Sequence, residues 1–200
     1  MQLFLRFYLP FYLMAYLAVA FALPTWRTWK QTGINPITFG NTDTAHNYIG
    51  FVMKLLIALL IMAVLCYSAG GQLYQYLVPV TYLQKEWLTG TGLLIIHISL
   101  AWIAIAQFQM STSWRIGIDE ENKTELKTKG LFSISRNPVF LGMIASVAGM
   151  FCIIPNAVTF FLTLTTYIII QVQIRLEEEF LTRQHGGNYI TYKATTRRLI

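Results

Sequence analysis

Five long apolar stretches separate the polar parts of this chain, and they constrain its fold more than any other feature. They cover residues 3–23, 48–67, 89–109, 138–154 and 157–174. A stretch of about 20 residues forms a helix roughly 30 Å long, which matches the hydrocarbon core of a bilayer. The sequence therefore predicts an all-α integral membrane protein with about five transmembrane helices.

The composition agrees with a membrane location. Of 200 residues, 55% are hydrophobic and only 12% are charged, whereas soluble domains carry about 25% charged residues. The net charge of +6 would suit nucleic acid in a polar protein. Here, however, the basic residues flank apolar stretches, where they would meet phospholipid headgroups. We therefore exclude a soluble enzyme and a disordered chain, and we expect the lipid bilayer, not nucleic acid, as a partner.

The first apolar stretch imitates a secretory signal peptide. Arg6 lies near its start, and the small residues Ala18, Val19 and Ala20 lie near its end, as at a cleavage site. We favour a retained membrane helix, because the stretch is longer than a usual signal core. It also contains three tyrosines, Tyr8, Tyr12 and Tyr16.

Turn-forming residues mark the connections between the stretches. Residues 24–47 are polar, and Gly33, Pro36 and Gly40 break any helix there, which predicts a loop. Residues 70–85 are aromatic, shorter and interrupted by Pro79, which indicates an interfacial segment. The last two stretches are joined by Pro155 and Asn156 alone. Only a tight turn fits there, so these two stretches are predicted to form a helical hairpin.

Some polar and sulfur-containing side chains lie inside the apolar stretches. His97 and Gln107 belong to the third stretch, and we expect them to form hydrogen bonds between helices. Cys66 and Cys152 show no metal-like spacing, so they are interpreted as small core hydrophobes. The chain also lacks a serine, histidine and aspartate grouping and a cysteine nucleophile. We therefore assign no catalytic residue and no metal ligand from these features.

Lysine and arginine predict the orientation. Most of them lie in residues 24–47, 110–136 and 175–200. Five spans place all three segments on one face, whereas the opposite face has little beyond Lys85. Cytoplasmic loops are enriched in Lys and Arg. We therefore expect the basic face and the polar tail to lie in the cytosol, with the amino terminus outside.

Two polar clusters on the basic face form the candidate site. In the first, residues 129–142, Pro138 suits the first turn of a helix because its missing N–H would have no partner there. By composition alone this cluster is a helix cap with a headgroup anchor. The second contains three consecutive acids, Glu177 to Glu179, which turn by about 100° per residue and cannot all face one partner. Glu179 precedes Arg183 by four residues, which predicts a surface ion pair.

The order of motifs in these clusters resembles a known family. R-N-P-V-F-L-G is followed by an apolar hairpin, E-E-x-x-L, G-x-x-Y-x-x-Y and a terminal basic and apolar run. This order is similar to the isoprenylcysteine carboxyl methyltransferase family and to related phospholipid methyltransferases. The resemblance covers about the last 85 residues, from Ser113 onward. We accordingly divide the chain into membrane helices at 1–110 and a methyltransferase-like core at 111–200.

The resemblance implies a cofactor and a set of binding residues. The implied cofactor is S-adenosylmethionine, held at the cytosolic face. Its implied binding residues are Thr124, Leu126, Lys127, Phe132, Asn137, Pro138, Val139, Phe140, Glu177 and Glu178. The family usually has His where this chain has Asn137 and Tyr where it has Phe140. Asparagine can still form hydrogen bonds and phenylalanine can still stack, so these changes favour retained binding over an acid–base role.

The resemblance also indicates where the methyl acceptor binds. Members that act on a prenylated cysteine carboxylate have an arginine four residues before the first glutamate of the pair, where this chain has Gln173. Arg175 is nearby but about 200° around the helix. We take Gln173 and Arg175 as the candidate acceptor-binding residues. The missing arginine argues against a carboxylate and for a lipid-like or apolar acceptor.

Two other classes of function share parts of this pattern. A membrane reductase of the sterol-reductase type has a similar carboxyl-terminal pattern and uses NADPH, but such chains usually have more spans. A non-enzymatic membrane protein that has kept the fold is the other alternative, and the changes at Asn137 and Phe140 support it. Binding of S-adenosylhomocysteine or of NADPH distinguishes the three.

Overall fold

The computed structural model describes residues 1–40, 42–119, 122 and 124–200. Within these residues the chain is helical, and pairing between extended segments is limited to isolated bridges. The helices are α1 (Gln2–Leu17), a π-helical turn (Ala18–Ala22), α2 (Leu23–Thr32), α3 (Ala45–Ala69), α4 (Gly71–Gln75), α5 (Glu86–Met110), α6 (Pro138–Ile153), α7 (Ala157–His185) and α8 (Gly187–Thr195). Short 3-10 turns lie at Thr81–Leu83, Ser111–Ser113 and Gly130–Ser133.

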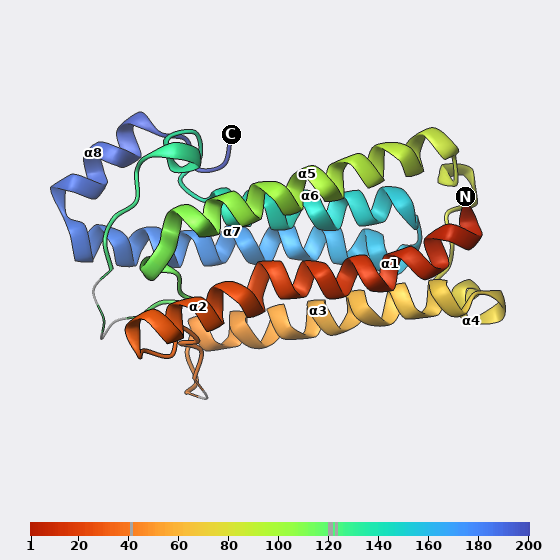
Figure 1. The fold of residues 1–200 in the computed structure, drawn as a ribbon, viewed down its shortest axis with the longest axis horizontal. Coiled ribbons are helices and arrows are strands. Elements are labelled where there is room, and N and C mark those ends of the chain that lie inside the picture. Colours follow the sequence, from red (N-terminus) through yellow and green to blue (C-terminus); the bar gives the residue numbers. More distant parts are fainter. Residues whose placement is uncertain (41, 120–121, 123) are drawn as a thin grey trace.

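Five of these helices, α1, α3, α5, α6 and α7, run side by side in alternating directions (Figure 1). In the described residues, four helical segments are long and apolar enough to cross a membrane, Gln2–Thr32, Ala45–Ala69, Glu86–Ser113 and Ala157–His185. The fifth, α6, has 16 residues and is shorter. The prediction of an all-α membrane protein is confirmed, while the count of five spans stays a prediction.

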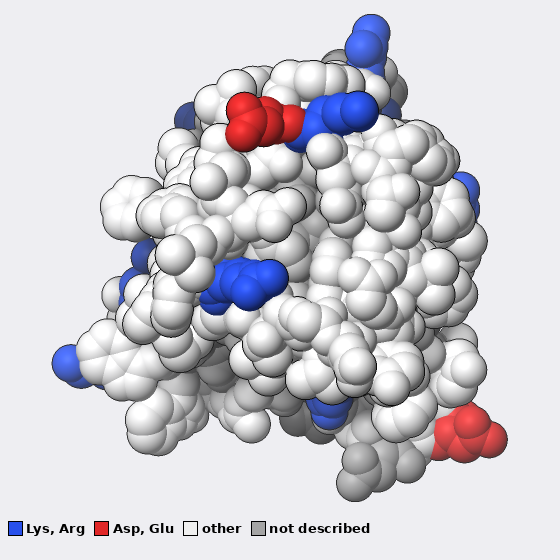
Figure 2. Space-filling model, turned by 90° about the vertical axis from the view of Figure 1, so that its right-hand side faces the viewer, with Lys and Arg blue, Asp and Glu red and all other residues white. Residues whose placement is uncertain are grey.

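The alternating directions give the bundle two different ends. The described residues of the segments 33–44, 111–137 and 186–200 lie at one end, which we call the basic end (Figure 1). Residues 70–85 and the turn between α6 and α7 lie at the other, which we call the far end. Figure 2 looks at the far end, where most of the surface is uncharged. The three basic segments that were predicted to share one face of the membrane therefore lie at the same end of the bundle.

The predicted loop over residues 24–47 is wrong in its first part, because α1 continues through the π-helical turn into α2 and ends at Gly33. Pro24 does not stop this helix. A proline has no N–H to give the carbonyl four residues earlier, which here belongs to Ala20. The side chain of Gln107 in α5 donates to that oxygen instead, over 2.6 Å. This also confirms Gln107 as an interhelical hydrogen-bond donor.

The last apolar stretch ends at Ile174, but α7 continues to His185, as the helical spacing assumed for Glu177 to Arg183 requires. Local pairs stabilise this polar extension. The hydroxyl of Thr182 donates to the backbone carbonyl of Glu178 over 2.6 Å, and the predicted ion pair between Arg183 and Glu179 forms over 2.8 Å. The charged residues therefore extend the helix beyond its apolar part.

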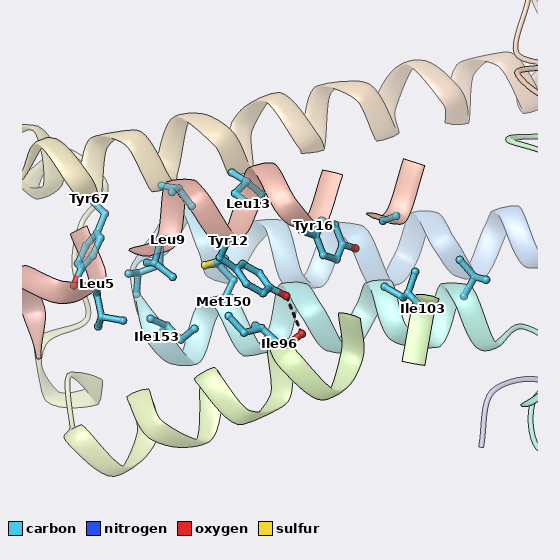
Figure 3. Close-up of a cluster of buried hydrophobic side chains, with 14 of the residues drawn as sticks. Leu5, Leu9, Tyr12, Leu13, Tyr16, Tyr67, Ile96, Ile103, Met150 and Ile153 are labelled. Carbon is cyan, nitrogen blue, oxygen red and sulfur yellow. Dashed lines mark hydrogen bonds between the residues drawn. The ribbon is translucent and has the colours of Figure 1, made fainter. Parts of the chain in front are cut away.

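The core between α1, α3, α5 and α6 is apolar and aromatic (Figure 3). Leu5, Leu9 and Leu13 of α1 are buried in it. The buried Tyr12 hydroxyl donates to the carbonyl of Ile96 over 2.8 Å. His97 contacts the hydroxyl of Tyr8, so the prediction of an interhelical hydrogen bond is confirmed for this histidine too. These polar side chains of α1 and α5 thus have partners in the core, as a lipid environment favours.

Glycines bring α5 and α6 into close contact. A Cβ atom added to Gly92 would lie 2.7 Å from the backbone oxygen of Gly149, and one added to Gly142 would lie 2.5 Å from the side chain of Ile103. Real Cβ atoms essentially never come so close. Small residues allow membrane helices to pack through direct backbone contact. This pair of helices forms the wall against which α1 and α7 pack.

The predicted hairpin between α6 and α7 is confirmed. Asn156 caps α7, since its side chain accepts from the backbone N–H of Thr159 over 2.9 Å. The turn also binds the segment between α4 and α5. The N–H of Val80 donates to the carbonyl of Pro155 over 2.9 Å, and the N–H of Ala157 donates to Leu77 over 3.1 Å. The far end is therefore a connected layer of backbone hydrogen bonds.

Candidate active site

Two cavities meet at the basic end of the bundle. The larger has a volume of about 350 Å³ and is enclosed by α1, α3, α6, α7 and the loops that precede α3 and α6. The smaller, of about 140 Å³, is lined by residues within 113–119 and 124–127 and by Tyr189 and Tyr192 of α8. Their common wall consists of Met110, Arg115, Gly117, Phe132, Arg136, Asn137 and Glu177.

Most of the binding residues predicted from the sequence line these cavities. Thr124, Leu126 and Lys127 line the smaller one. Pro138, Val139, Phe140 and Gln173 line the larger one, and Phe132, Asn137 and Glu177 line both. Glu178 and Arg175 line neither. The structure therefore brings together segments that lie about 50 residues apart in the chain.

The carboxyl-terminal tail holds the entrance of α6 in place. Residue Ser135 forms a parallel bridge with Arg197, and the N–H of Arg136 donates to the carbonyl of Arg197 over 2.9 Å. The side-chain amide of Asn137 donates to the carbonyl of Arg198, also over 2.9 Å. The loop before α6 thus pairs with a short extended segment from the end of the chain, and this fixes Asn137 at the cavity wall.

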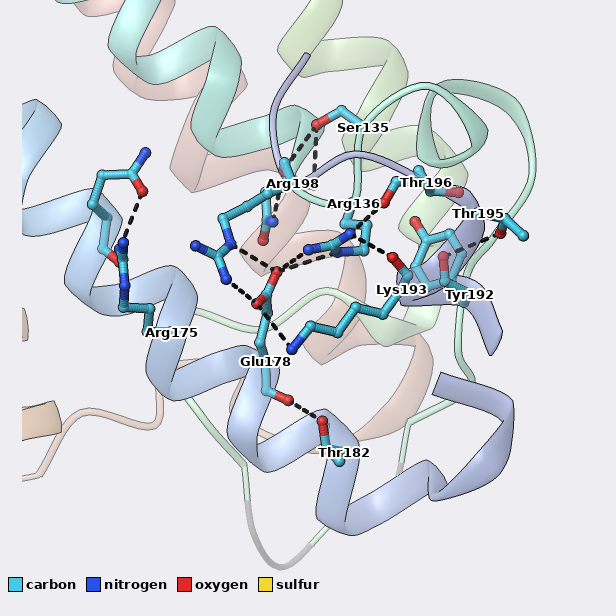
Figure 4. Close-up of polar contacts among 12 residues, drawn as sticks. Ser135, Arg136, Arg175, Glu178, Thr182, Tyr192, Lys193, Thr195, Thr196 and Arg198 are labelled. Atoms are coloured by element: carbon cyan, nitrogen blue, oxygen red, sulfur yellow. Dashed lines mark hydrogen bonds and ion pairs between the residues drawn. The ribbon is translucent and has the colours of Figure 1, made fainter. Parts of the chain in front are cut away.

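Glu178 is the centre of this attachment (Figure 4). It is buried, and it accepts from Arg136 over 2.7 Å and from Arg198 over 2.7 Å. Lys193 lies 3.9 Å from the same carboxylate. Both carboxylate oxygens are therefore engaged by cations from the loop and from the tail. Such charge-assisted bonds are the strong ones in proteins. Glu178 connects α7, the loop and the tail.

Glu177, the next residue, points into the cavities. The amide of Gln173 donates to Oε1 of Glu177 over 2.8 Å, and within the described residues Glu177 makes no other hydrogen bond. Gln173 is 1% exposed, and its own Oε1 is buried without a partner. A buried polar atom without a partner is costly. This wall therefore offers a carboxylate oxygen and an amide oxygen to a ligand with N–H or O–H groups.

Residues 86–188 match the model of a family described as phospholipid methyltransferase, which is just over half of the chain. The chain belongs to the phospholipid methyltransferase family. No curated protein matches it. This family is part of the isoprenylcysteine carboxyl methyltransferase-like group of membrane methyltransferases, so the resemblance inferred from the motifs is confirmed. The protein is a multi-pass membrane methyltransferase, and the match gives no support to the reductase or the non-enzymatic alternative.

The matched region of this phospholipid methyltransferase family member contains Arg175, but the structure does not bring that residue to the site. Its side chain is exposed and bonds to Gln171 on the same helix, with 2.5 Å to the backbone carbonyl. Figure 4 shows it apart from the Glu178 cluster. The side chain at 173 is the one that faces the apolar cavity.

Part of the cavity wall comes from outside the matched region. Tyr16 of α1, Met53 and Lys54 of α3 and Phe39 in the preceding loop all line the larger cavity. The motifs gave no indication of these residues. A sequence signal exists at Gly50, where an added Cβ would lie 2.5 Å from the ring of Phe39. A lone glycine among bulky residues of a predicted span thus marks the place where a loop packs against the helix.

Arg115 and Asp119 stabilise the loop over the smaller cavity. Their side chains pair over 2.9 Å, and the backbone N–H of Asn122 donates to Asp119 over 3.0 Å. Burial alone would raise the pKa of Asp119, but the hydrogen bonds from Arg115 and Asn122 more than offset it and hold the pKa below 3.8. The aspartate is therefore charged at neutral pH and holds Arg115 and Asn122 together at the edge of the cavity.

Proposed function

We propose that this membrane methyltransferase uses S-adenosylmethionine as its methyl donor and acts on a lipid-like or apolar acceptor. The observation that carries the proposal is the position of Glu177 in the wall shared by a small polar cavity and a larger apolar cavity. S-adenosylmethionine supplies, when bound, a methyl group on a positively charged sulfur. The two cavities adjoin at these shared residues, so they can hold the polar donor and the apolar acceptor next to each other.

The residues of the smaller cavity fit this cofactor. Glu177, which lines both cavities, has a carboxylate oxygen without a partner among the described residues, and Gln173 of the larger cavity has an amide oxygen without a partner there as well. A carboxylate binds an ammonium group or accepts from ribose hydroxyls. Phe132 supplies an aromatic surface for a base. Asn137 uses its amide N–H on the tail, so its oxygen can accept a hydrogen bond at the position where the family usually has histidine.

The larger cavity fits an acceptor with an apolar body. Its volume of about 350 Å³ falls in the range of small-molecule sites, and most of its wall comes from apolar side chains of α3, α6 and α7. Gln173 is uncharged, so it does not clamp a carboxylate as an arginine would. We infer that the reacting group is neutral or a soft nucleophile. If it arrives protonated, the free oxygen of Glu177 is placed to accept the proton.

Glu177→Gln tests the cofactor site, because it keeps the shape of the side chain and removes its charge. Loss of a charge-assisted hydrogen bond should weaken the binding of S-adenosylhomocysteine by about 1.5 to 3 kcal/mol. The measurement is calorimetric titration of the purified protein in detergent, with NADPH as the comparison ligand. The matched control is Glu179→Gln, since Glu179 is exposed and pairs with Arg183. Equal affinities in the two variants would refute the assignment.

We further propose that the basic end faces the cytosol, as the distribution of Lys and Arg favours. The test is labelling of single cysteines by an impermeant maleimide in intact cells. Cysteines at Thr128 and Thr191, which are exposed at the basic end, should be protected until the membrane is permeabilised. A cysteine at Tyr76, exposed at the far end, should react at once. The reverse pattern would refute the orientation.

A further inference from the structure

A third cavity, of about 390 Å³, lies at the far end, away from both cavities of the candidate site. Its wall combines the start of α1, the junction between α3 and α4, the segment before α5 and Pro155 of the hairpin turn. It shares no residue with the larger or the smaller cavity. Methyl transfer at the basic end therefore does not account for it.

Arg6 is the charged residue that α1 contributes to this cavity. Its guanidinium lies directly against Gly70, where an added Cβ would be 2.6 Å from Nη1. Gly70 has a φ of 69°, so glycine is required there for backbone reasons as well. The glycine thus makes room for the guanidinium at the junction of α3 and α4.

This half-buried arginine makes no hydrogen bond or ion pair with any residue that the structure describes. A guanidinium carries five N–H donors and keeps its charge at any physiological pH. Arg6 lies four residues after the first residue of α1, about 6 Å along the helix. An arginine this close to the end of a membrane helix can reach the headgroup region.

The rest of the rim favours an anion with several acceptor oxygens. Lys85 adds a second positive charge and Glu86 one negative charge, so the cavity stays positive overall. Gln75, Gln84 and Thr81 add neutral hydrogen-bonding groups. An arginine fork matches the oxygens of a phosphate group in a bidentate way. We propose that the far-end cavity is a phosphate-binding site centred on Arg6, for a phospholipid headgroup or for free phosphate.

The experiment counts lipids that stay bound to the purified, intact protein in native mass spectrometry. The probes are mixed micelles with phosphatidylglycerol, mixed micelles with a diacylglycerol glycolipid that lacks phosphate, and inorganic phosphate alone. The variant is Arg6→Gln, and the matched control is Arg175→Gln, which removes an exposed arginine that lines none of the three cavities. Loss of the guanidinium should lower the affinity for phosphatidylglycerol by about tenfold or more.

The three probes distinguish a site for a phospholipid headgroup from a site for free phosphate. Phosphatidylglycerol bound by wild type and by Arg175→Gln, but lost from Arg6→Gln, supports a headgroup site. Binding of inorganic phosphate with the same dependence on Arg6 supports a site for free phosphate. Equal binding of every probe by the two variants, or equal retention of the glycolipid and phosphatidylglycerol, overturns the proposal. If Arg6→Gln does not fold, Lys85→Gln replaces it, because Lys85 is exposed at the rim and its loss should weaken binding severalfold; unchanged binding then overturns the proposal.

Discussion

Replacing Glu178 with glutamine should detach the carboxyl-terminal tail from the loop before α6. The carboxylate is 4% exposed and engages Arg136 and Arg198, each over 2.7 Å. Glutamine keeps one oxygen acceptor but turns its NH₂ group toward an arginine. The side chain of Arg136 is 7% exposed, so its charge would stay buried without its partner.

The expected loss of stability in Glu178→Gln follows from the burial of this ion pair. Removing one partner of a buried ion pair costs about 3 to 5 kcal/mol. Arg198 is 34% exposed and can turn toward water, so its share is smaller. We therefore expect a loss near the lower limit, about 3 kcal/mol. For a chain of this size that loss lowers the Tm by roughly 6 to 12 °C.

Thermal unfolding in detergent measures this loss, and limited digestion with trypsin measures tail release at Lys193, Arg197 and Arg198. The matched control is Glu179→Gln, one residue further along α7. The pair between Glu179 and Arg183 is 65% and 61% exposed, and such a pair contributes about 0 to 1 kcal/mol. Equal Tm values and equal cleavage of the two variants would refute the structural role of Glu178.

Three further predictions concern other parts of the molecule. Gln107→Leu should destabilise the fold by about 1 to 3 kcal/mol in thermal unfolding, because the oxygen of Ala20 loses its donor, and a second change, Pro24→Ala, should restore most of the loss by supplying an N–H. The lowered pKa of Asp119 means that its stabilisation is complete above about pH 4 and lost as the pH falls through the folded pKa; the protection factors of the amides near Arg115 and Asn122, which compare exchange with that of an unfolded peptide at the same pH, should therefore fall in acid for wild type, and Asp119→Asn should remove that dependence. Gln173→Arg should not raise transfer of labelled methyl into a membrane extract, because an unpaired guanidinium beside an apolar cavity is costly, and a large gain would point to an anionic acceptor.

Hydrophobicity predicted the long helices well where the apolar stretch and the helix have nearly the same bounds. The stretch at residues 89–109 became α5, Glu86–Met110, and the stretch at 138–154 became α6, Pro138–Ile153. The prediction was wrong at residues 24–32, where the polar helix α2 continues from the first apolar stretch. A loop was predicted from residue 24 onward, but the helix continues through Pro24, because α5 supplies the missing hydrogen-bond donor through Gln107. Such compensation comes from tertiary contacts, which periodicity within one segment does not reveal.

Most residues of the candidate site could be predicted from the sequence, but the different contacts of Glu177 and Glu178 could not. Glu177 and Glu178 are adjacent and chemically equal in the sequence. In the structure one lines the cavities, and the other is enclosed by Arg136 and Arg198, which lie 42 residues before and 20 residues after it. The helical turn of about 100° per residue predicted that they face different partners. Which partners these are depends on how the tail folds back.

The contact of Gly92 with Gly149 limits how far related chains can diverge. At a contact between two larger side chains, an enlargement on one helix can be offset by a reduction on the other. Here the backbone oxygen of Gly149 lies 2.7 Å from the position that a Cβ of residue 92 would take, and the oxygen of Gly92 lies 3.1 Å from that of a Cβ of residue 149. Glycine is already the smallest residue, so a larger residue at one of the two positions cannot be offset by a smaller residue at the other. By contrast, the outward-facing Phe4 and Phe11 are 58% and 66% exposed and can be replaced by other apolar residues.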